Sequence, residues 1–331
     1  MNNLTNSSAK SIARDQAGIS VVIPVYRSAA IIEKLVARLE VILQAITLEF
    51  EIVLVNDCSP DQSWTIISKL AADDPHVRGI NLMRNFGQHN ALLCGIRAAR
   101  FDVIVTMDDD LQHPPEEVSK LLALLTGTDC DLVYGTSEHK QHGVARNLAV
   151  FITRLALRTV MGADVVERVS AFRAFKSDIV PAFRNYEGPF VSIDVLLSWG
   201  TNKVGAVQVR HEPRAEGSSG YTLRKLMTYT LNLVTGFTPL PLRLASVIGL
   251  ASSAIGIVVL CYVLIRYVLH GDTVPGFPFL ASIIALFSGA QLFAIGIIGE
   301  YLARMHFRTM QMPSYVVRDD TGGNSAMDRR G

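Results

Sequence analysis

Residues 101–117 read FDVIVTMDDDLQHPPEE, and this stretch decides the fold of the N-terminal part of the chain. The apolar, β-branched run FDVIVT predicts a buried strand. Pro114 and Pro115 suit the start of a helix, where the proline nitrogen takes the place of an amide that would be unbonded anyway. A strand, an acidic turn and a helix in this order predict an α/β sheet, which binds its ligands at the carboxyl ends of its strands.

Three carboxylates occupy that turn, Asp108, Asp109 and Asp110, and Gln112 follows them. Like charges are costly to place together unless a positive charge joins them. A hard divalent cation that has oxygen ligands and is shared with a phosphate meets this need. We therefore expect a site for a metal and a diphosphate, and the alternative is an acidic cap on the following helix.

Segments typical of strands and of helices alternate along the first 134 residues. The expected strands are residues 19–25, 51–55, 77–83, 103–106 and 131–134, and the expected helices are residues 29–46, 62–72, 88–100 and 116–125. This alternation predicts a mostly parallel sheet with helices on both faces. After Gly135 the pattern loosens. Residues 144–160 and 221–236 predict basic amphipathic helices, which lie either among the lipid headgroups or on the sheet.

Two long uncharged stretches predict membrane helices. Residues 244–265 and 277–299 are each long enough to cross a hydrocarbon layer of about 30 Å. They lack the polar face that a pair of buried core helices would show. The short connection makes them a hairpin whose outer flanks are basic, so the positive-inside rule places the N-terminal part in the cytoplasm. Residues 1–17 lack the apolar core of a signal peptide and predict a disordered extension.

Composition argues against several classes of function. The net charge of the 331 residues is +1, so no strongly basic surface indicates a nucleic-acid partner. The mean hydropathy of +0.29 is high for a soluble enzyme and reflects the last third of the chain. The four cysteines are dispersed and form no CxxC pair, which fits a reducing compartment. Neither GxGxxG nor GxxxxGK[ST] occurs, which argues against a dehydrogenase and a P-loop nucleotidase.

Several motifs occur in a family-specific order. They are VVIPVY at 21–26, VNDCSPD at 55–61, RNFGQH at 84–89, MDDDLQHPPEE at 107–117, SAFRAF at 170–175, GSSGYTLRKL at 217–226 and GEY at 299–301. With them the chain resembles glycosyltransferase family 2 over about residues 18–310. Within this family it resembles the membrane-anchored polyprenyl-phosphate glycosyltransferases, such as dolichol-phosphate mannosyltransferase and bactoprenol-phosphate sugar transferases. The resemblance implies the GT-A fold of nucleotide-diphospho-sugar transferases.

The resemblance also implies roles for single residues. The nucleotide sugar would be bound by Pro24, Tyr26, Asp57, Arg84, Asp108 and Asp109. Mg²⁺ or Mn²⁺ would be held against the diphosphate by Asp108, Asp110 and Gln112. The expected catalytic residues are Asp110, Glu167 and Arg173, and the expected ligands of the acceptor phosphate are Arg146, Arg214 and Ser219. Family members usually carry Asp where this chain has Asn56, which leaves recognition of the base open.

These features predict an inverting, metal-dependent transfer of a sugar from a nucleotide-diphospho-sugar, with a UDP-sugar expected, to a polyprenyl phosphate such as undecaprenyl phosphate. The second pKa of a phosphate monoester is near 6. The acceptor is therefore largely a dianion at pH 7 and needs little help from a general base. The product would be a lipid-linked sugar for cell-envelope glycans. The alternatives are a processive polysaccharide synthase, which would normally carry a QxxRW motif, and a catalytically inactive membrane-anchored scaffold that binds nucleotide sugars.

The expected organisation has five parts. They are an extension (1–17), a cytosolic catalytic domain (18–215), an amphipathic juxtamembrane region (216–243), two transmembrane helices within 244–304 (about 244–268 and 277–303) and a cytosolic tail (305–331). The tail after Tyr315 is expected to be flexible, apart from a short strand at residues 315–317. We expect an integral protein of the bacterial inner membrane that forms homo-oligomers, with a tetramer as one option.

Overall fold

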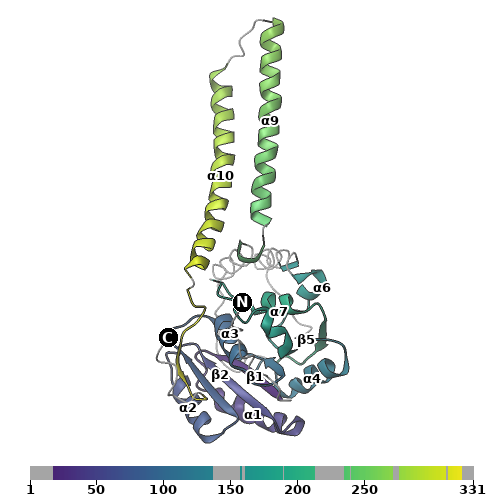
Figure 1. Cartoon of the computed structure of the whole chain (residues 1–331), viewed down its shortest axis with the longest axis vertical. Helices are drawn as coiled ribbons and strands as arrows, with labels where there is room; N and C mark the ends of the chain where they lie inside the picture. The colour runs from purple at the N-terminus through teal and green to yellow at the C-terminus, as the bar shows by residue number, and fades with distance from the viewer. Residues whose placement is uncertain are drawn as a thin grey trace, which may run out of the picture.

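A mixed β-sheet lies at the centre of the catalytic part. The computed structural model describes residues 18–136, 157–158, 161–188, 190–212, 235–238, 240–270, 276–310 and 312–322. Within these residues eight strands form one sheet in the order β7-β5-β6-β4-β1-β2-β3-β8 (Figure 1). The strands are β1 (Ile19–Val25), β2 (Phe50–Asn56), β3 (Val77–Leu82), β4 (Val103–Thr106), β5 (Leu132–Thr136), β6 (Arg173–Lys176), β7 (Val204–Gln208) and β8 (Val317–Asp320).

Helices cover both faces of this sheet. The helices of the described residues are α1 (Ile32–Ile46), α2 (Ser63–Asp73), α3 (Gln88–Ala98), α4 (Val118–Gly127), α6 (Ala163–Val166), α7 (Ile193–Gly200), and the two long helices α9 (Leu240–His270) and α10 (Phe277–Thr309), which lie away from the sheet, with 3-10 turns η1 (Pro115–Glu117) and η2 (Ser177–Ala182). Side chains of α1, α2 and α4 pack in one core cluster, and those of α3 and α7 pack in another on the opposite face. The predicted fold, a mostly parallel sheet between two layers of helices, is confirmed.

The strands in the middle of the sheet are apolar on both faces, which is why the sequence predicted them. β1 pairs in parallel with β2 and β4, and β2 pairs in parallel with β3. Val21 and Ile23 enter one core cluster while Val22 enters the other, so β1 is apolar on both faces. Gly95 lets α3 approach closely, because a Cβ at this position would lie 2.3 Å from a methyl group of Val22.

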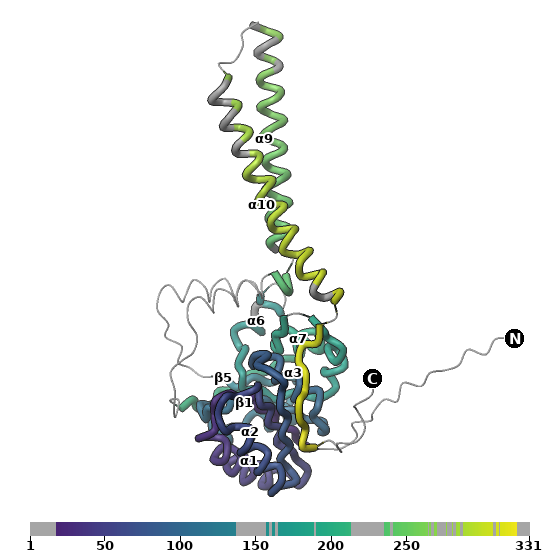
Figure 2. The backbone as a smooth tube through the Cα atoms, turned by 90° about the vertical axis from the view of Figure 1, so that its left-hand side faces the viewer, coloured from purple at the N-terminus to yellow at the C-terminus, as the bar shows by residue number. Residues whose placement is uncertain are grey.

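Three strands fall outside the predicted pattern. β6 runs antiparallel to both β4 and β5, and β7 pairs in parallel with β5. β8 belongs to the tail beyond α10 and pairs antiparallel with β3. Figure 2 shows the tail passing α3 on its way to the edge of the sheet. The expectation of a flexible tail is therefore wrong for residues 317–322, and the strand begins two residues later than predicted.

The two longest helices stand away from the catalytic part as a hairpin (Figure 1). Among the described residues, one segment is long and apolar enough to cross a membrane, Pro241–Val263 in α9. Its apolar side chains are largely exposed, for example Val247 at 63% and Leu250 at 73%. Exposed apolar surface of this length fits a lipid environment. The second span stays a prediction.

Candidate active site

The carboxyl ends of four neighbouring strands carry the polar residues that we expected to bind a ligand. β4, β1, β2 and β3 are adjacent and parallel. Their loops, residues 107–112, 24–28, 56–59 and 83–87, therefore meet at one edge of the sheet. This edge is where α/β proteins bind their ligands.

Asp109 faces the loop that follows β1. Its Oδ2 accepts a hydrogen bond from the backbone amide of Tyr26 at 3.1 Å and a short one from the hydroxyl of Ser28. Burial raises the pKa of Asp109; these two hydrogen bonds oppose the rise, and the nearby Asp110 carboxylate adds to it. Asp109 thus joins the ends of β1 and β4. Sequence reasoning missed Ser28, although its place directly after the first strand was a usable signal.

Asp108 and Asp110 are the carboxylates that this loop offers to a cation. Oδ1 of Asp108 accepts from the side-chain amide of Gln88 at 2.6 Å, and Oδ1 of Asp110 accepts from the backbone amide of Gln112 at 3.1 Å. Among the described residues, no group of three or more His, Cys, Asp or Glu side chains is arranged to hold a metal ion. Mg²⁺ usually binds through one or two carboxylates and substrate phosphates. Asp108 and Asp110 therefore fit a cation shared with a diphosphate.

Asp57 lies at the end of β2 and braces the loop before α3. Its two carboxylate oxygens accept from the backbone amides of Phe86 at 2.7 Å and Gly87 at 2.8 Å. Burial raises the pKa of Asp57, and these two amide bonds oppose the rise. Gly87 has φ +92°, a conformation that favours glycine. Each carboxylate oxygen has two lone pairs and can accept a second hydrogen bond. Contact of Asp57 with a nucleotide stays a prediction.

The other expected nucleotide residues differ in accessibility. Tyr26 is 43% exposed, and the Arg27 guanidinium lies 5.4 Å from the centre of its ring. Arg84 is exposed and lies 4.6 Å from the centre of the Phe86 ring. Pro24 is buried within β1. Tyr26 and Arg84 are therefore accessible to a ligand, whereas Pro24 is part of the buried strand β1.

Arg173 lies at the start of β6 and takes part in a buried ion pair. It is 1% exposed, and its guanidinium pairs with the Asp194 carboxylate and donates to the Thr106 hydroxyl at 2.9 Å. The Tyr134 hydroxyl donates to the same carboxylate at 3.2 Å. In the structure the guanidinium is held in this buried ion pair, and the expected catalytic role of Arg173 stays a prediction. Asp194 was missed because it lies 21 residues away in the sequence.

His89 lies beside this ion pair and was also missed. Its Nδ1 accepts from the backbone amide of Ile193 at 3.3 Å. Burial lowers the pKa of His89 to about 4, with Asp194 opposing the shift and Arg173 adding to it. The ring is therefore neutral at pH 7. The motif RNFGQH was a usable signal for this residue.

The expected acceptor side of the site is described only at Glu167. Its carboxylate pairs with Arg158 at 2.9 Å, and its side chain is 65% exposed. The three expected ligands of the acceptor phosphate, Arg146, Arg214 and Ser219, lie outside the described residues.

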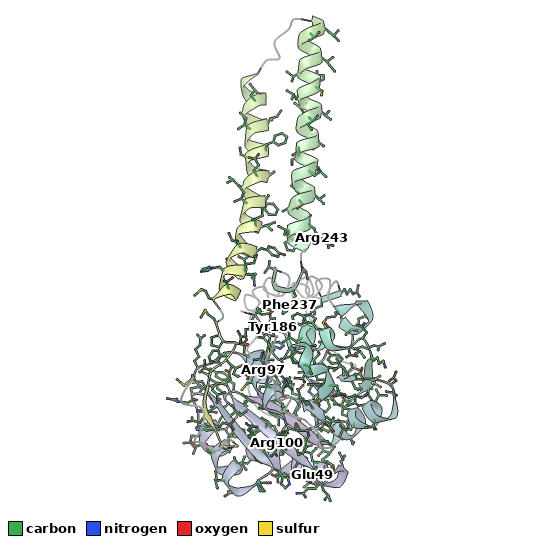
Figure 3. The ribbon with its side chains drawn as sticks, in the orientation of Figure 1. Glu49, Arg97, Arg100, Tyr186, Phe237 and Arg243 are labelled. Atoms are coloured by element: carbon green, nitrogen blue, oxygen red, sulfur yellow. The ribbon has the colours of Figure 1, made fainter. Side chains whose placement is uncertain are left out.

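Aromatic side chains gather between the catalytic part and the base of the hairpin. The cluster consists of Tyr186, Phe190, Trp199 and Phe237, with ring centres 5.5 to 6.5 Å apart. Figure 3 shows Tyr186 and Phe237 just below α9, where Arg243 marks its first turn. The Tyr301 hydroxyl donates to the Thr238 carbonyl at 2.6 Å and so ties α10 to this region. A cavity lined in part by Tyr186, Phe237 and Tyr301 lies here.

Comparisons with known proteins find related sequences along most of the chain. The model of the family described as glycosyl transferase family 2 matches residues 20–178. The undecaprenyl-phosphate 4-deoxy-4-formamido-L-arabinose transferase of Shewanella sediminis is 31% identical over 315 residues, which cover 94% of this chain and 95% of that protein. The protein of the same name from Yersinia enterocolitica is 31% identical, covering 92% of this chain and 94% of that protein.

Solved structures show weaker likeness. Glucosyl-3-phosphoglycerate synthase from Mycobacterium tuberculosis, in complex with Mn²⁺, UDP and glucosyl-3-phosphoglycerate, is 19% identical with a TM-score of 0.48. It covers 66% of this chain and 78% of its own. Mannosyl-3-phosphoglycerate synthase from Rubrobacter xylanophilus is 16% identical with a TM-score of 0.49, covering 66% of this chain and 72% of its own.

Proposed function

The chain belongs to glycosyltransferase family 2, and from this premise we propose that it transfers a sugar from a nucleotide-diphospho-sugar to undecaprenyl phosphate. That it is a glycosyltransferase follows from the family itself. The observation that carries the proposal is the acidic loop at the edge formed by β4, β1 and β2, in a chain that also holds the apolar helix α9. Relatives that match along more than nine-tenths of the chain carry undecaprenyl phosphate in their names.

The donor is proposed to lie across the loops after β1, β2 and β4. Tyr26 after β1 is exposed there, Arg84 in the adjacent loop after β3 is exposed as well, and Asp57 supports that second loop through the amides of Phe86 and Gly87. Asp108 and Asp110 would hold Mg²⁺ or Mn²⁺, with Gln112 as a further proposed ligand. A bound divalent cation stabilises the negative charge that develops on the leaving diphosphate. We propose a UDP-sugar as the donor.

The acceptor is proposed to attack through a phosphate oxygen, from the face of the sugar opposite the leaving diphosphate. This displacement inverts the anomeric centre. Since the phosphate is largely a dianion at pH 7, the protein needs mainly to position it, which arginine does well. Arg146, Arg214 and Ser219 are proposed for this task, and Glu167 for minor assistance.

The membrane part is proposed to keep the catalytic domain at the cytoplasmic surface of a bacterial inner membrane. Residues 244–268 and 277–303 would span the bilayer, and copies of the chain would form homo-oligomers. Trp and Tyr favour the boundary between lipid and water, so the aromatic cluster would lie at headgroup level. Holding the site beside a membrane-bound acceptor raises its effective concentration.

The test uses the full chain, purified in detergent, with undecaprenyl phosphate and a panel of radiolabelled nucleotide sugars. The panel includes the UDP-linked form of 4-deoxy-4-formamido-L-arabinose, because the relatives' names contain that sugar. Each reaction is run with Mg²⁺, with Mn²⁺ and with chelator. Label should enter the organic phase with one donor and only with metal.

Two results would contradict the proposal in different ways. Metal-dependent hydrolysis of a donor without lipid product would leave a glycosyltransferase with another acceptor. Binding of donors without any turnover would favour the inactive scaffold.

A further inference from the structure

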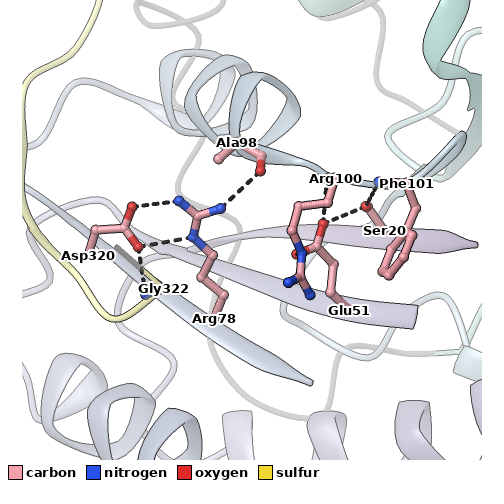
Figure 4. A network of polar contacts seen from close by, with 8 residues as sticks. All are labelled: Ser20, Glu51, Arg78, Ala98, Arg100, Phe101, Asp320 and Gly322. Carbon is pink, nitrogen blue, oxygen red and sulfur yellow. Dashed lines mark hydrogen bonds and ion pairs between the residues drawn. The ribbon is translucent and has the colours of Figure 1, made fainter. Parts of the chain in front are cut away.

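The tail beyond α10 is fastened to the sheet through β8. The Arg78 guanidinium donates to both oxygens of Asp320, at 3.0 and 2.7 Å, and to the Ala98 carbonyl at 3.0 Å (Figure 4). The Thr321 hydroxyl accepts from the Gly79 amide at 2.8 Å. A strand distant in sequence is thereby held along β3.

A series of hydrogen bonds leads from this strand to the loop after β2, which we propose binds the nucleotide sugar. The Asn81 side-chain amide donates to Asp319 at 2.9 Å, and the Asn56 side-chain amide donates to the Asn81 side-chain oxygen at 2.8 Å. The Asn56 side-chain oxygen then accepts from the backbone amide of Ser59 at 3.3 Å. Asn81 is 6% exposed and Asn56 is 1% exposed, so water competes little for these groups.

The last of these bonds supports a strained turn. Cys58 has φ +51°, a left-handed conformation that is uncommon for residues other than glycine. The bond between Asn56 and the Ser59 amide closes the turn around it. The hydroxyl of Ser59 in turn accepts from the Arg27 amide at 3.1 Å, which joins the loops after β1 and β2.

Asp319 determines which group donates and which accepts in each of these hydrogen bonds. A carboxylate accepts hydrogen bonds and does not donate, whereas an asparagine amide does both. Asp319 therefore requires the NH₂ group of Asn81 to face the tail and its oxygen to face Asn56. That orientation in turn leaves the oxygen of Asn56 facing the Ser59 amide. The side-chain amide of Asn56 supplies the NH₂ group that this arrangement needs.

We infer that Asp319, on the C-terminal tail, is a positioning residue for the donor pocket and acts through Asn81 and Asn56 on the loop at Asp57–Ser59. The inference rests on the proposed function, because it takes this loop as part of a nucleotide-sugar site. It assigns the tail a role in catalysis although the tail lies beyond the membrane hairpin. Asp319 has no contact with the substrate in this role.

The test compares three substitutions at one position in the full-length protein. Asp319→Ala removes the acceptor, Asp319→Asn keeps an acceptor oxygen, and Asp319→Lys replaces it with a donor that reverses both amides. Arg318→Ala, an exposed neighbour in the same strand, is the matched control. Thr321→Val loosens the strand without touching the hydrogen-bond chain. The readouts are UDP binding with Mn²⁺ by calorimetry and amide hydrogen exchange at residues 56–61.

Asp319→Ala should raise the Kd for UDP by about fivefold, which corresponds to the roughly 1 kcal/mol of one net hydrogen bond. Asp319→Lys should raise it further, and both should speed exchange at Ser59. Asp319→Asn and Arg318→Ala should stay within about twofold of the wild type, since each removes less than one such bond.

Two outcomes would overturn the inference. Unchanged amide hydrogen exchange at Ser59 in Asp319→Ala would mean that the hydrogen bonds from Asp319 do not stabilise the turn at Cys58. Equal effects of Thr321→Val and Asp319→Ala would mean that attachment of the tail matters and the carboxylate does not. Failure of the wild type to bind UDP, with exchange altered in Asp319→Ala, would instead refute the proposed function and leave the hydrogen-bond chain standing.

Discussion

Replacing Asp194 with alanine should strongly destabilise the catalytic domain. The Arg173 guanidinium, 1% exposed, would lose its anionic partner, and the Tyr134 hydroxyl, fully buried, would lose its acceptor. Removing one partner of a buried ion pair costs about 3–5 kcal/mol, because it leaves an uncompensated charge in the interior. For a domain of this size each kcal/mol lowers Tm by about 2–4 °C, so a fall of about 10 °C is expected.

Tryptophan fluorescence on heating is the suitable assay. The two tryptophans, Trp64 in α2 and Trp199 in α7, both lie in the catalytic part, so the signal reports this domain and not the hairpin. Lys203→Ala is the control. It breaks the exposed pair with Asp129 and should leave Tm unchanged, since surface ion pairs contribute little.

A double variant separates the lost charge from the lost side chain. Arg173→Met with Asp194→Leu removes both charges and fills the space with apolar groups. Such replacements of buried pairs are often neutral or stabilising, so the double variant should melt above Asp194→Ala. A single variant within about 2 °C of the wild type, against the several kcal/mol expected, would refute the reasoning. A double variant that melts no higher than the single one would refute it as well.

Three further predictions concern turnover, pH and the membrane. Asp110→Ala removes a proposed cation ligand and should therefore lower kcat at least about a hundredfold while Tm stays unchanged. Asp129→Ala is the control, and wild-type turnover in Asp110→Ala would contradict the metal assignment. Burial lowers the pKa of His89 from 6.5 to about 4, so its neutral ring contributes stability above pH 6.5 that is lost as the pH falls toward 4. Between pH 7 and 4 the wild type should lose about 3 kcal/mol more than His89→Asn in urea unfolding, and equal losses would contradict this shift. Leu250→Arg, near the middle of the apolar segment of α9, should cost about 2.5 kcal/mol of insertion; retention in carbonate-washed membranes equal to the wild type would argue against a span there.

The strands that sequence reasoning found share one property. β1, β2 and β4 are short apolar runs buried on both faces, each followed by a polar turn. Burial on both faces forces continuous apolar sequence, so the strands and the order of the loops were readable without a structure. The same holds for α9, whose length and uniform apolarity depend on composition alone.

The strands and contacts that were missed, or predicted only in part as β8 was, depend on partners far away in the chain. β6 has four residues and begins with a charged one, Arg173, so no strand was predicted there. Only folding brings Asp194 to that guanidinium. β8 carries Arg318 and two aspartates and has no apolar pattern. It is a strand because it completes the edge of β3 and pairs Asp320 with Arg78.

For the candidate site too, the sequence determined one part and the tertiary structure another. The sequence by itself determined which residue types meet at the sheet edge, because parallel strands bring their carboxyl ends together. It could not determine where each carboxylate points, since the direction is set by hydrogen bonds from other loops. Asp109 turns to the Tyr26 amide and Asp57 to the amides of Phe86 and Gly87. Tertiary structure alone made these choices, because a buried carboxylate must find donors and the fold decides which donors are near.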